Sequence, residues 1–291
     1  MTDTFLVTGS TGNVGSQVVK QLSSLNGNIR AAVQLKNRAG ELKNTRARIV
    51  EMDFNRPETI RMAFEGVQKL FLLTPFVPNM VEISTNLVDE AKNAKVKHIV
   101  KLSVMGADLE ADVGAMRLHL QAEKIIEKSG IPYTFLRPNE FMQNFLNFHS
   151  PSIKSNNAFY SPREDAKVSF VDVRDIAAIA VEVLTNNDNG KHNNKTYLIT
   201  GPEALSYYQA GEILSNETHK KISYVNVSDE EARGAMKETG MNDWLINTIS
   251  ELSDYFRKGY ASQVSSAIEE ITGKKPTPFA RFAKDNAEAF R

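Results

Sequence analysis

A glycine motif near the N-terminus constrains the fold of this chain more than any other feature. Three glycines stand at a G-x-x-G-x-x-G spacing within Gly9–Gly15. An apolar stretch typical of a strand, 4–8, precedes them, a helical pattern over 13–24 begins inside the motif, and a second strand pattern covers 29–35. This order predicts a βαβ unit whose helix N-terminus holds the pyrophosphate of a dinucleotide. The alternative is a tight turn between a strand and a helix that binds no ligand.

The pyrophosphate site is expected to include the whole loop and the first helical turn. Its candidate residues are Thr8, Gly9, Ser10, Thr11, Gly12, Asn13, Val14 and Gly15. Glycines allow the backbone to turn tightly and to approach the phosphates, and the first helical N–H groups point at the anion.

Strand and helix patterns alternate over the first two hundred residues, which predicts an α/β fold with a doubly wound parallel sheet of the Rossmann type. The pattern changes after Gly201 to helices with charged faces, one of which is predicted over 262–272. We therefore expect a dinucleotide-binding domain from 1–138 plus 166–201. A smaller, mostly helical substrate or partner lobe is expected from 139–165 plus 202–291.

Composition excludes several function classes. Lys+Arg and Asp+Glu are equal at 35 each, which disfavours nucleic-acid binding. The chain has no cysteine, so disulfides, thiolate catalysis and cysteine zinc sites are excluded, and its 5 scattered histidines predict no metal site. The N-terminus lacks a basic leader, and no apolar stretch reaches the ~18 residues of a membrane span. We expect a soluble cytoplasmic protein.

The segment after the second predicted strand indicates which dinucleotide binds. An acidic residue about 20 positions beyond the glycines usually holds the ribose 2′-hydroxyl of NAD, whereas a nearby Arg accommodates a 2′-phosphate. Residues 26–40 contain no acid but include Gln34, Lys36 and Arg38. This favours NADP(H) and leaves NAD(H) open. The alternative is an ordinary solvated loop.

Two further strand ends supply candidate cofactor residues. Asp53, followed by Phe54 at the end of the third predicted strand, 48–52, is placed to receive the adenine amino group; its alternative is an N-cap for the helix beginning at Pro57. Thr74 and Pro75 lie at the end of the fourth predicted strand, 69–74, beside the expected ribose and pyrophosphate.

Several sequence blocks together resemble the NmrA-like family of atypical short-chain dehydrogenases, which includes bacterial NAD(P)H:quinone oxidoreductases and triphenylmethane-dye reductases. The blocks are Thr8–Gly15, Lys101-Leu102-Ser103, Ser129–Pro138 with Phe141 and Asn144, Asp172–Ala177 and Tyr197–Pro202. They span nearly the whole chain and occur in the order typical of the family.

The resemblance implies further site residues. Leu102 and Ser103 would flank the nicotinamide together with the segment Pro138-Asn139-Glu140, and Phe141 and Asn144 would face the substrate pocket. Members of the family often carry Arg where this chain has Gln34. Selectivity for NADP would therefore rest on Lys36 and Arg38.

The acid/base dyad of classical short-chain dehydrogenases, a Tyr followed four residues later by a Lys, is absent at all 8 tyrosines. Alcohol oxidation and sugar epimerisation thereby lose their usual catalyst. Reduction of an electron-poor planar acceptor such as a quinone is less demanding, because hydride can pass directly from a reduced nicotinamide.

Ser103 and His119 are the candidate catalytic residues. Ser103 is placed to hydrogen-bond a substrate carbonyl, or to satisfy local backbone only. His119 lies where the missing Tyr would stand and is a candidate proton donor, or else half of an exposed pair with Glu123 at i,i+4. Phe141, Phe145 and Phe148 form either a flat pocket or ordinary core.

The leading hypothesis is an NADP(H)-dependent reductase that passes hydride to a quinone or similar planar small molecule. A non-catalytic NADP(H)-sensing regulator of the NmrA type is the first alternative, and a nucleoside-diphosphate-sugar epimerase is the second. A homodimer and a regulatory protein partner are both left open.

Overall fold

The computed structural model describes residues 3–25, 27–109, 113–186 and 190–291, and only the backbone of Arg38. Two compact units make up the chain, each assembled from three stretches. The first unit comprises Met1–Ala107, Leu118–Arg137 and Val173–Tyr197, and the second comprises Asp108–Arg117, Pro138–Asp172 and Leu198–Arg291. The functional domain boundaries expected from the sequence stay a prediction, because compactness alone does not show which residues bind a substrate.

A seven-stranded sheet with the order β3-β2-β1-β4-β5-β6-β9 forms the centre of the first unit. Its strands are β1 (Thr4–Val7), β2 (Asn28–Val33), β3 (Arg48–Glu51), β4 (Lys69–Leu72), β5 (His98–Leu102), β6 (Tyr133–Pro138) and β9 (Lys195–Ile199). The pairs from β3 to β6 are all parallel. Short apolar runs such as 69–72 are buried throughout, as a parallel sheet covered on both faces requires. The predicted doubly wound sheet is confirmed.

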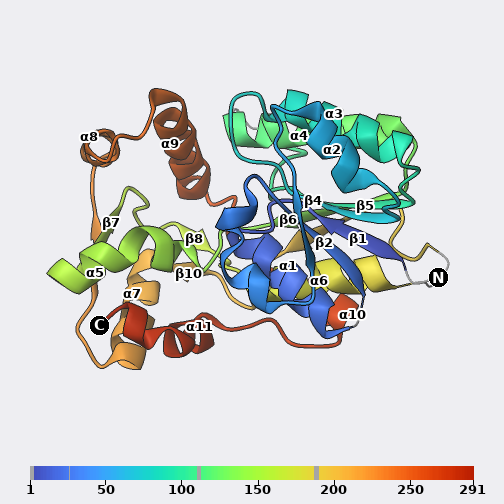
Figure 1. The fold of residues 1–291 in the computed structure, drawn as a ribbon. Coiled ribbons are helices and arrows are strands. Elements are labelled where there is room, and N and C mark those ends of the chain that lie inside the picture. The colour runs from blue at the N-terminus through green and yellow to red at the C-terminus, as the bar shows by residue number, and fades with distance from the viewer. Residues whose placement is uncertain (1–2, 26, 110–112, 187–189) are drawn as a thin grey trace. The chain divides into compact units, whose positions relative to one another are not determined.

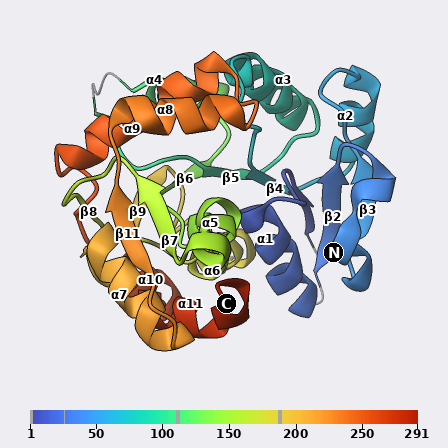
Figure 2. The same cartoon turned by 90° about the vertical axis from the view of Figure 1, so that its left-hand side faces the viewer.

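Helices cover both faces of this sheet (Figures 1 and 2). On one face α1 (Asn13–Ser24) packs against α6 (Val173–Thr185). On the other lie α2 (Pro57–Phe64), α3 (Met80–Asn93) and α4 (Gly114–Ser129). Apolar residues recur at helical spacing, so each helix buries one stripe against the strands. Within the described part of the chain, no helix has the length and apolar character needed to cross a bilayer.

The second unit is mostly helical, as expected, but it also contains two small ribbons. Its helices are α5 (Ser150–Asn156), α7 (Tyr207–Thr218), α8 (Asp229–Glu238), α9 (Asp243–Arg257), α10 (Ala267–Thr272) and α11 (Phe279–Asp285). The ribbons pair β7 (Ala158–Ser161) with β11 (Ser223–Asn226) in parallel, and β8 (Lys167–Val168) with β10 (Leu205–Ser206) antiparallel. Strands of two to four residues are too short for an alternating pattern to be read from the sequence.

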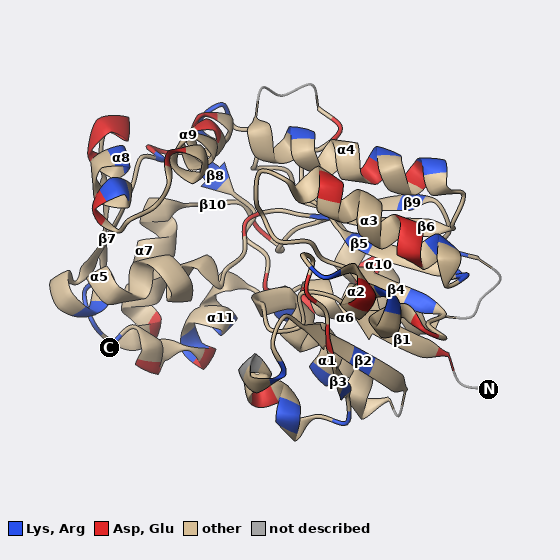
Figure 3. Cartoon of the chain, turned by 45° about the horizontal axis from the view of Figure 1, so that its top comes forward, with Lys and Arg blue, Asp and Glu red and all other residues tan. Residues whose placement is uncertain are grey.

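Local capping chemistry fixes where several of these helices begin. Ser206 and Ser228 each form a capping box at the start of α7 and α8, and the Asn242 side chain accepts the Leu245 N–H at the start of α9. Figure 3 shows both acidic and basic residues along α8. Three of its acidic residues, Asp229, Glu230 and Glu231, occupy the first turn, where the helix dipole favours negative charge.

One predicted helix, 262–272, begins only at Ala267. The backbone groups of residues 261–265 form hydrogen bonds with other segments instead of the hydrogen bonds of a helix. The carbonyl of Ala261 accepts the Asn139 amide at 2.7 Å, and Ser265 N–H donates to Thr200 Oγ1 at 2.9 Å. Tertiary hydrogen bonds therefore override the helical pattern there.

His98 makes the first unit sensitive to acid. Its Nε2 lies 2.9 Å from Thr134 Oγ1 inside the sheet, and burial lowers its pKa from 6.5 to about 4. Between these two pH values, His98 is therefore protonated in the unfolded chain and neutral in the folded chain. We expect the free energy of unfolding to fall by about 3 kcal/mol from this residue as the pH drops from 6.5 to 4.

Denaturant titrations between pH 7 and 4 measure this effect. His98→Gln should flatten the dependence, whereas His219→Asn, at an exposed histidine in the left-handed conformation, should leave it unchanged. An equally steep fall in His98→Gln would show that other groups carry the acid sensitivity.

Candidate functional site

The glycine motif forms a tight loop between β1 and α1. Gly9 adopts a left-handed φ of +61°, and a Cβ there would stand 2.6 Å from the side chain of Leu73. A Cβ on Gly15 would stand 2.2 Å from the Gly9 carbonyl oxygen. The first turn of α1 thus packs directly on the backbone of the loop, and glycine is required at both positions.

The N-terminus of α1 is open to an anion. Gly12 is its N-cap, and no side chain of the described residues caps the helix. Thr11, Gly12 and Asn13 are exposed, while Val14 and Gly15 are buried beneath them. Uncapped N–H groups and the helix dipole attract a phosphate, so this end of α1 fits a pyrophosphate group.

The hydroxyls of the loop hold its shape. Thr8 Oγ1 donates to the Leu73 carbonyl at 2.8 Å and accepts the Leu73 N–H at 2.7 Å, which ties the end of β1 to the end of β4. Ser10 Oγ donates to the Val7 carbonyl at 2.7 Å. These two side chains are engaged in the protein, so they support the loop from below.

The strand register brings most predicted residues of the first unit to one edge of the sheet. Val7 pairs with Phe71, and Leu72 pairs with Lys101. The residues that follow the strands therefore share the carboxyl edge, where ligands of such sheets bind. They are the loop after β1, Gln34 after β2, Asp53 and Phe54 after β3, Thr74 and Pro75 after β4, and Leu102 and Ser103 at the end of β5.

The segment expected to read the 2′-phosphate lies at this edge. Gln34 and Lys36 are exposed, and the side chain of Arg38 lies outside the described part of the chain. Arg30, further back on β2, instead donates from Nη1 to the Ala63 carbonyl at 2.9 Å and ties β2 to α2. Among the described side chains of this segment, the Lys36 ammonium is therefore placed to contact a phosphate.

Asp53 shapes the turn before α2. Its carboxylate accepts the Asn55 N–H at 3.0 Å and Arg56 Nε at 3.3 Å. The N-cap of α2 is Arg56, so the interpretation of Asp53 as the N-cap residue is wrong, although it stabilises the same corner. Phe54 packs against the apolar core of the unit. Binding of adenine by Asp53 stays a prediction.

Ser103 has a buried hydroxyl that lacks a partner. The residue is 4% exposed, and its Oγ makes no hydrogen bond among the described residues. Its N–H donates to the Leu136 carbonyl at 2.7 Å and extends the pairing of β5 with β6. Buried hydroxyls are nearly always hydrogen-bonded, so this one is available to a water or a ligand, and a hydrogen bond from Ser103 to a substrate stays a prediction.

A buried charged cluster lies next to Ser103, and sequence reasoning missed its central member. The Lys101 ammonium donates to the Leu102 carbonyl at 2.9 Å and lies 3.1 Å from Nδ1 of His119 on α4. Burial lowers the pKa of Lys101 from 10.5 to about 8; nearby Glu123 raises it and Arg137 lowers it. The signal in the sequence was a lysine between the apolar residues Val100 and Leu102 of β5.

The same cluster excludes one of the two interpretations of His119, while proton donation by His119 stays a prediction. The Glu123 carboxylate accepts hydrogen bonds from Arg137 Nε at 3.0 Å and from Arg137 Nη2 at 2.6 Å, and Glu123 is 2% exposed. The interpretation of His119 and Glu123 as an exposed pair is therefore wrong, because His119 contacts Lys101 and Glu123 contacts Arg137. Burial and the charge of Lys101 hold the pKa of His119 well below 6.5, so its imidazole is neutral at pH 7.

The candidate residues of the second unit surround the turn after β6. Pro138 and Asn139 are buried, and the Asn139 amide donates to Ser169 Oγ and to the Ala261 carbonyl, both at 2.7 Å. Glu140 accepts the Tyr207 hydroxyl at 2.7 Å. Asn139 thus holds the unit together, whereas Glu140 is only partly buried.

Three phenylalanines of this region have different surroundings. Phe145 is 1% exposed, and its ring lies 5.0 Å from that of Phe279, so it belongs to an aromatic core. Phe148 is 68% exposed. Phe141 and Asn144 are partly buried, so contact of these two with a substrate stays a prediction.

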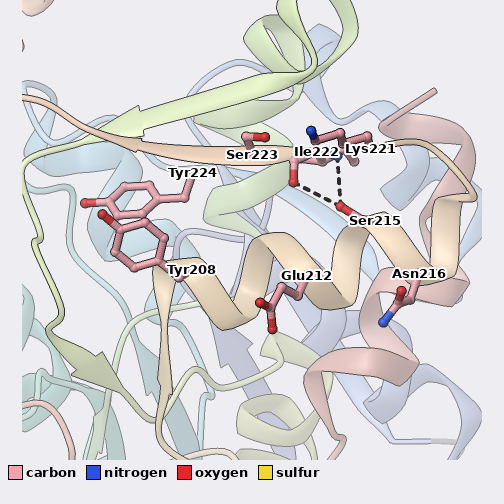
Figure 4. Close-up of a pocket in the computed structure, with 8 residues that line it drawn as sticks. All are labelled: Tyr208, Glu212, Ser215, Asn216, Lys221, Ile222, Ser223 and Tyr224. Carbon is pink, nitrogen blue, oxygen red and sulfur yellow. Dashed lines mark hydrogen bonds between the residues drawn. The ribbon is translucent and has the colours of Figure 1, made fainter.

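A surface hollow of about 530 Å³ lies elsewhere in the second unit, between α7 and β11 (Figure 4). It is lined by Tyr208, Glu212, Ser215, Asn216, Lys221, Ile222, Ser223 and Tyr224. Ser215 Oγ is used structurally, since it donates to the Ile222 carbonyl at 2.9 Å and accepts the Ile222 N–H at 2.8 Å. The hollow contains no residue predicted to bind cofactor or substrate.

Comparison with known proteins adds to this geometry. The sequence profile described as the NmrA-like family matches residues 1–283. An NAD(P)H azoreductase of Xenophilus azovorans is 35% identical over 98% of both chains, and quinone oxidoreductase 2 of Escherichia coli is 27% identical over 94% of this chain and 95% of its own. The crystal structure of Citrobacter triphenylmethane reductase complexed with NADP(H) superposes with a TM-score of 0.85 at 27% identity, covering 97% of this chain and 99% of the other.

Proposed function

The chain belongs to the NmrA-like family, and from this premise we propose that it is an NAD(P)H-dependent oxidoreductase that reduces a quinone, an azo dye or a similar planar electron-poor acceptor. The observation that carries the proposal is the full-length similarity to an NAD(P)H azoreductase and to a quinone oxidoreductase. It is supported by the open N-terminus of α1 above the glycine loop, which fits the pyrophosphate of such a cofactor.

The residues at the carboxyl edge have separate tasks in this proposal. The backbone of Gly9–Gly15 holds the pyrophosphate, Lys36 and Arg38 hold the 2′-phosphate, and Asp53 receives the adenine amino group. The cofactor, when bound, supplies hydride. The protein orients the acceptor and excludes water, and the orphaned hydroxyl of Ser103 donates a hydrogen bond to an acceptor carbonyl or nicotinamide amide.

The acceptor class follows from what the chain lacks. None of its tyrosines is followed four residues later by lysine, so the usual catalyst for removing a hydroxyl proton is missing. An electron-poor acceptor needs only hydride and a weak proton donor. Water or a side chain near Ser103 supplies this proton. A sugar epimerase, in contrast, would lack the residue that removes the hydroxyl proton.

Turnover and cofactor binding are tested together. We expect the purified protein to oxidise NADPH when a soluble quinone or azo dye is added. The reaction is measured as the loss of the reduced-nicotinamide absorbance at about 340 nm. NADPH binding without turnover on any such acceptor would favour the sensing regulator. No binding of any nicotinamide nucleotide would overturn the proposal.

Calorimetry with NADPH and NADH measures the cofactor preference. Lys36→Ala should weaken NADPH binding about 10-fold and leave NADH binding unchanged, since one charge-assisted contact to the 2′-phosphate is lost. Lys97→Ala, an exposed lysine before the start of β5, is the matched control and should change neither affinity. Equal affinity of the unmodified protein for NADPH and NADH would contradict the assignment.

A further inference from the structure

Lys101 is a buried charged group that the function proposed above does not use. It is 1% exposed, and among the described residues its ammonium contacts the Leu102 carbonyl and His119 Nδ1. Within the described residues it makes no salt bridge, and Glu123, whose charge favours the ammonium, is paired with Arg137. Burying an ammonium without a paired carboxylate is costly, so its retention at this place calls for a function.

The contact with Lys101 fixes the protonation of His119. An ammonium can only donate, so Nδ1 must accept and cannot carry a proton of its own. The neutral imidazole then holds its single proton on Nε2. Because Lys101 also donates to the carbonyl that precedes Ser103, the pair sits at the carboxyl end of β5, where the hydride acceptor is expected.

We propose that Lys101 and His119 form a proton relay, in which His119 Nε2 protonates the reduced acceptor and the Lys101 ammonium delivers a proton to Nδ1. The relay rests on the function proposed above. It names the proton donor that replaces the absent tyrosine, with His119 acting on the acceptor and Lys101 as a positioning residue that acts through it.

The proton and electron balance closes. Hydride from the reduced nicotinamide brings two electrons to the acceptor and leaves a negative charge on an acceptor heteroatom. The Nε2–H bond of His119 breaks as the heteroatom–H bond forms, and an N–H bond of Lys101 breaks as Nδ1–H forms. A proton from water then returns to Nε2, and the Nδ1 proton returns to Lys101. One solvent proton is consumed for each hydride.

The surrounding charges set the pH range of the relay. Lys101 on β5 meets Glu123 on α4, which favours its charged form, and Arg137 on β6, which disfavours it. With the pKa of Lys101 lowered to about 8, its ammonium is present at neutral pH and is lost as the pH rises through 8. A proton donor with a pKa near the working pH transfers its proton readily.

Nitrogen NMR of the protein labelled with ¹⁵N-histidine, without nucleotide, provides the first test. We expect His119 to be neutral and protonated on Nε2 between pH 6 and 8, with Nδ1 shifted as a hydrogen-bond acceptor. Lys101→Met should abolish the Nδ1 shift and raise the pKa of His119. Lys69→Met is the matched control, because it removes another buried lysine of the same sheet without touching His119. A proton on Nδ1 in the unmodified protein would overturn the relay.

The pH profile of kcat provides the second test. It should fall above about pH 8 in the unmodified enzyme, because the Lys101 ammonium is then lost. Lys101→Arg keeps a cation that can donate a hydrogen bond to Nδ1 but cannot give up a proton, so kcat should fall and this alkaline limb should disappear while the Nδ1 shift is retained. An unchanged alkaline limb in folded Lys101→Arg refutes the relay and leaves the reductase proposal intact. The expected NMR result without turnover on any acceptor would instead refute the reductase proposal.

Discussion

Replacing Gly15 by alanine should lower the affinity for NADPH at least about 100-fold. The added Cβ would stand 2.2 Å from the Gly9 carbonyl oxygen and 2.7 Å from the Gly9 carbonyl carbon. Both are backbone atoms, and Gly9 cannot retreat because its oxygen accepts the Gly12 N–H at 3.0 Å and its α-carbon faces Leu73. The start of α1 must therefore move and lose phosphate contacts, each worth about 1.5–3 kcal/mol.

Calorimetry gives the affinity and circular dichroism gives the thermal stability. Gly234→Ala, within α8, is the control, because nothing lies within 4 Å of the added Cβ and a helix favours alanine over glycine. Gly12→Ala is an intermediate case, since its Cβ would meet only the Gly9 oxygen, at 3.3 Å. Tight NADPH binding by a folded Gly15→Ala variant would show that the nucleotide does not use this loop.

Replacing Glu123 by glutamine should lower the free energy of unfolding by about 3 kcal/mol. Glu123 and Arg137 form a bidentate ion pair in which the carboxylate is 2% exposed. The amide can accept only one of the two hydrogen bonds, so the substitution leaves a buried guanidinium poorly compensated. The Lys101 ammonium also loses the charge that favours it, so the pKa of Lys101 should fall further below 8.

Denaturant unfolding measures this change against Glu288→Gln, the same substitution at an exposed glutamate paired with Arg291. The control should change the free energy of unfolding by less than about 0.5 kcal/mol, because exposed ion pairs contribute little. A loss below about 1 kcal/mol for Glu123→Gln would mean that solvent reaches the buried pair and screens it.

Local patterns were sufficient to predict most of the first unit. The bounds of α1, predicted as 13–24, are those observed, because glycines mark the start of the helix and apolar residues recur every three or four positions along it. The strands 48–52 and 69–74 were predicted within two residues for a similar reason. Each signal lies within about ten neighbouring residues, so no knowledge of the tertiary structure was needed.

The features that escaped prediction depend on partners that are distant in the sequence. Asn139 holds Ala261 across 122 positions, and that contact keeps the segment before α10 from being helical. Lys101 resembles a lysine on the exposed face of a strand until α4 brings His119 to it. A sequence pattern records which faces are apolar, but it does not record which buried polar groups will meet.

The interleaved stretches of the first unit bear on how the protein is made. The sheet needs β9, which ends at Ile199, and α1 needs α6, which ends at Thr185 and whose Arg174 carbonyl accepts the Gln21 amide at 3.0 Å. The glycine loop is synthesised well before α6, so its supporting helix pair is incomplete until that later helix has left the ribosome. A growing chain must therefore keep the apolar faces of β1 and α1 from aggregating until these late elements arrive.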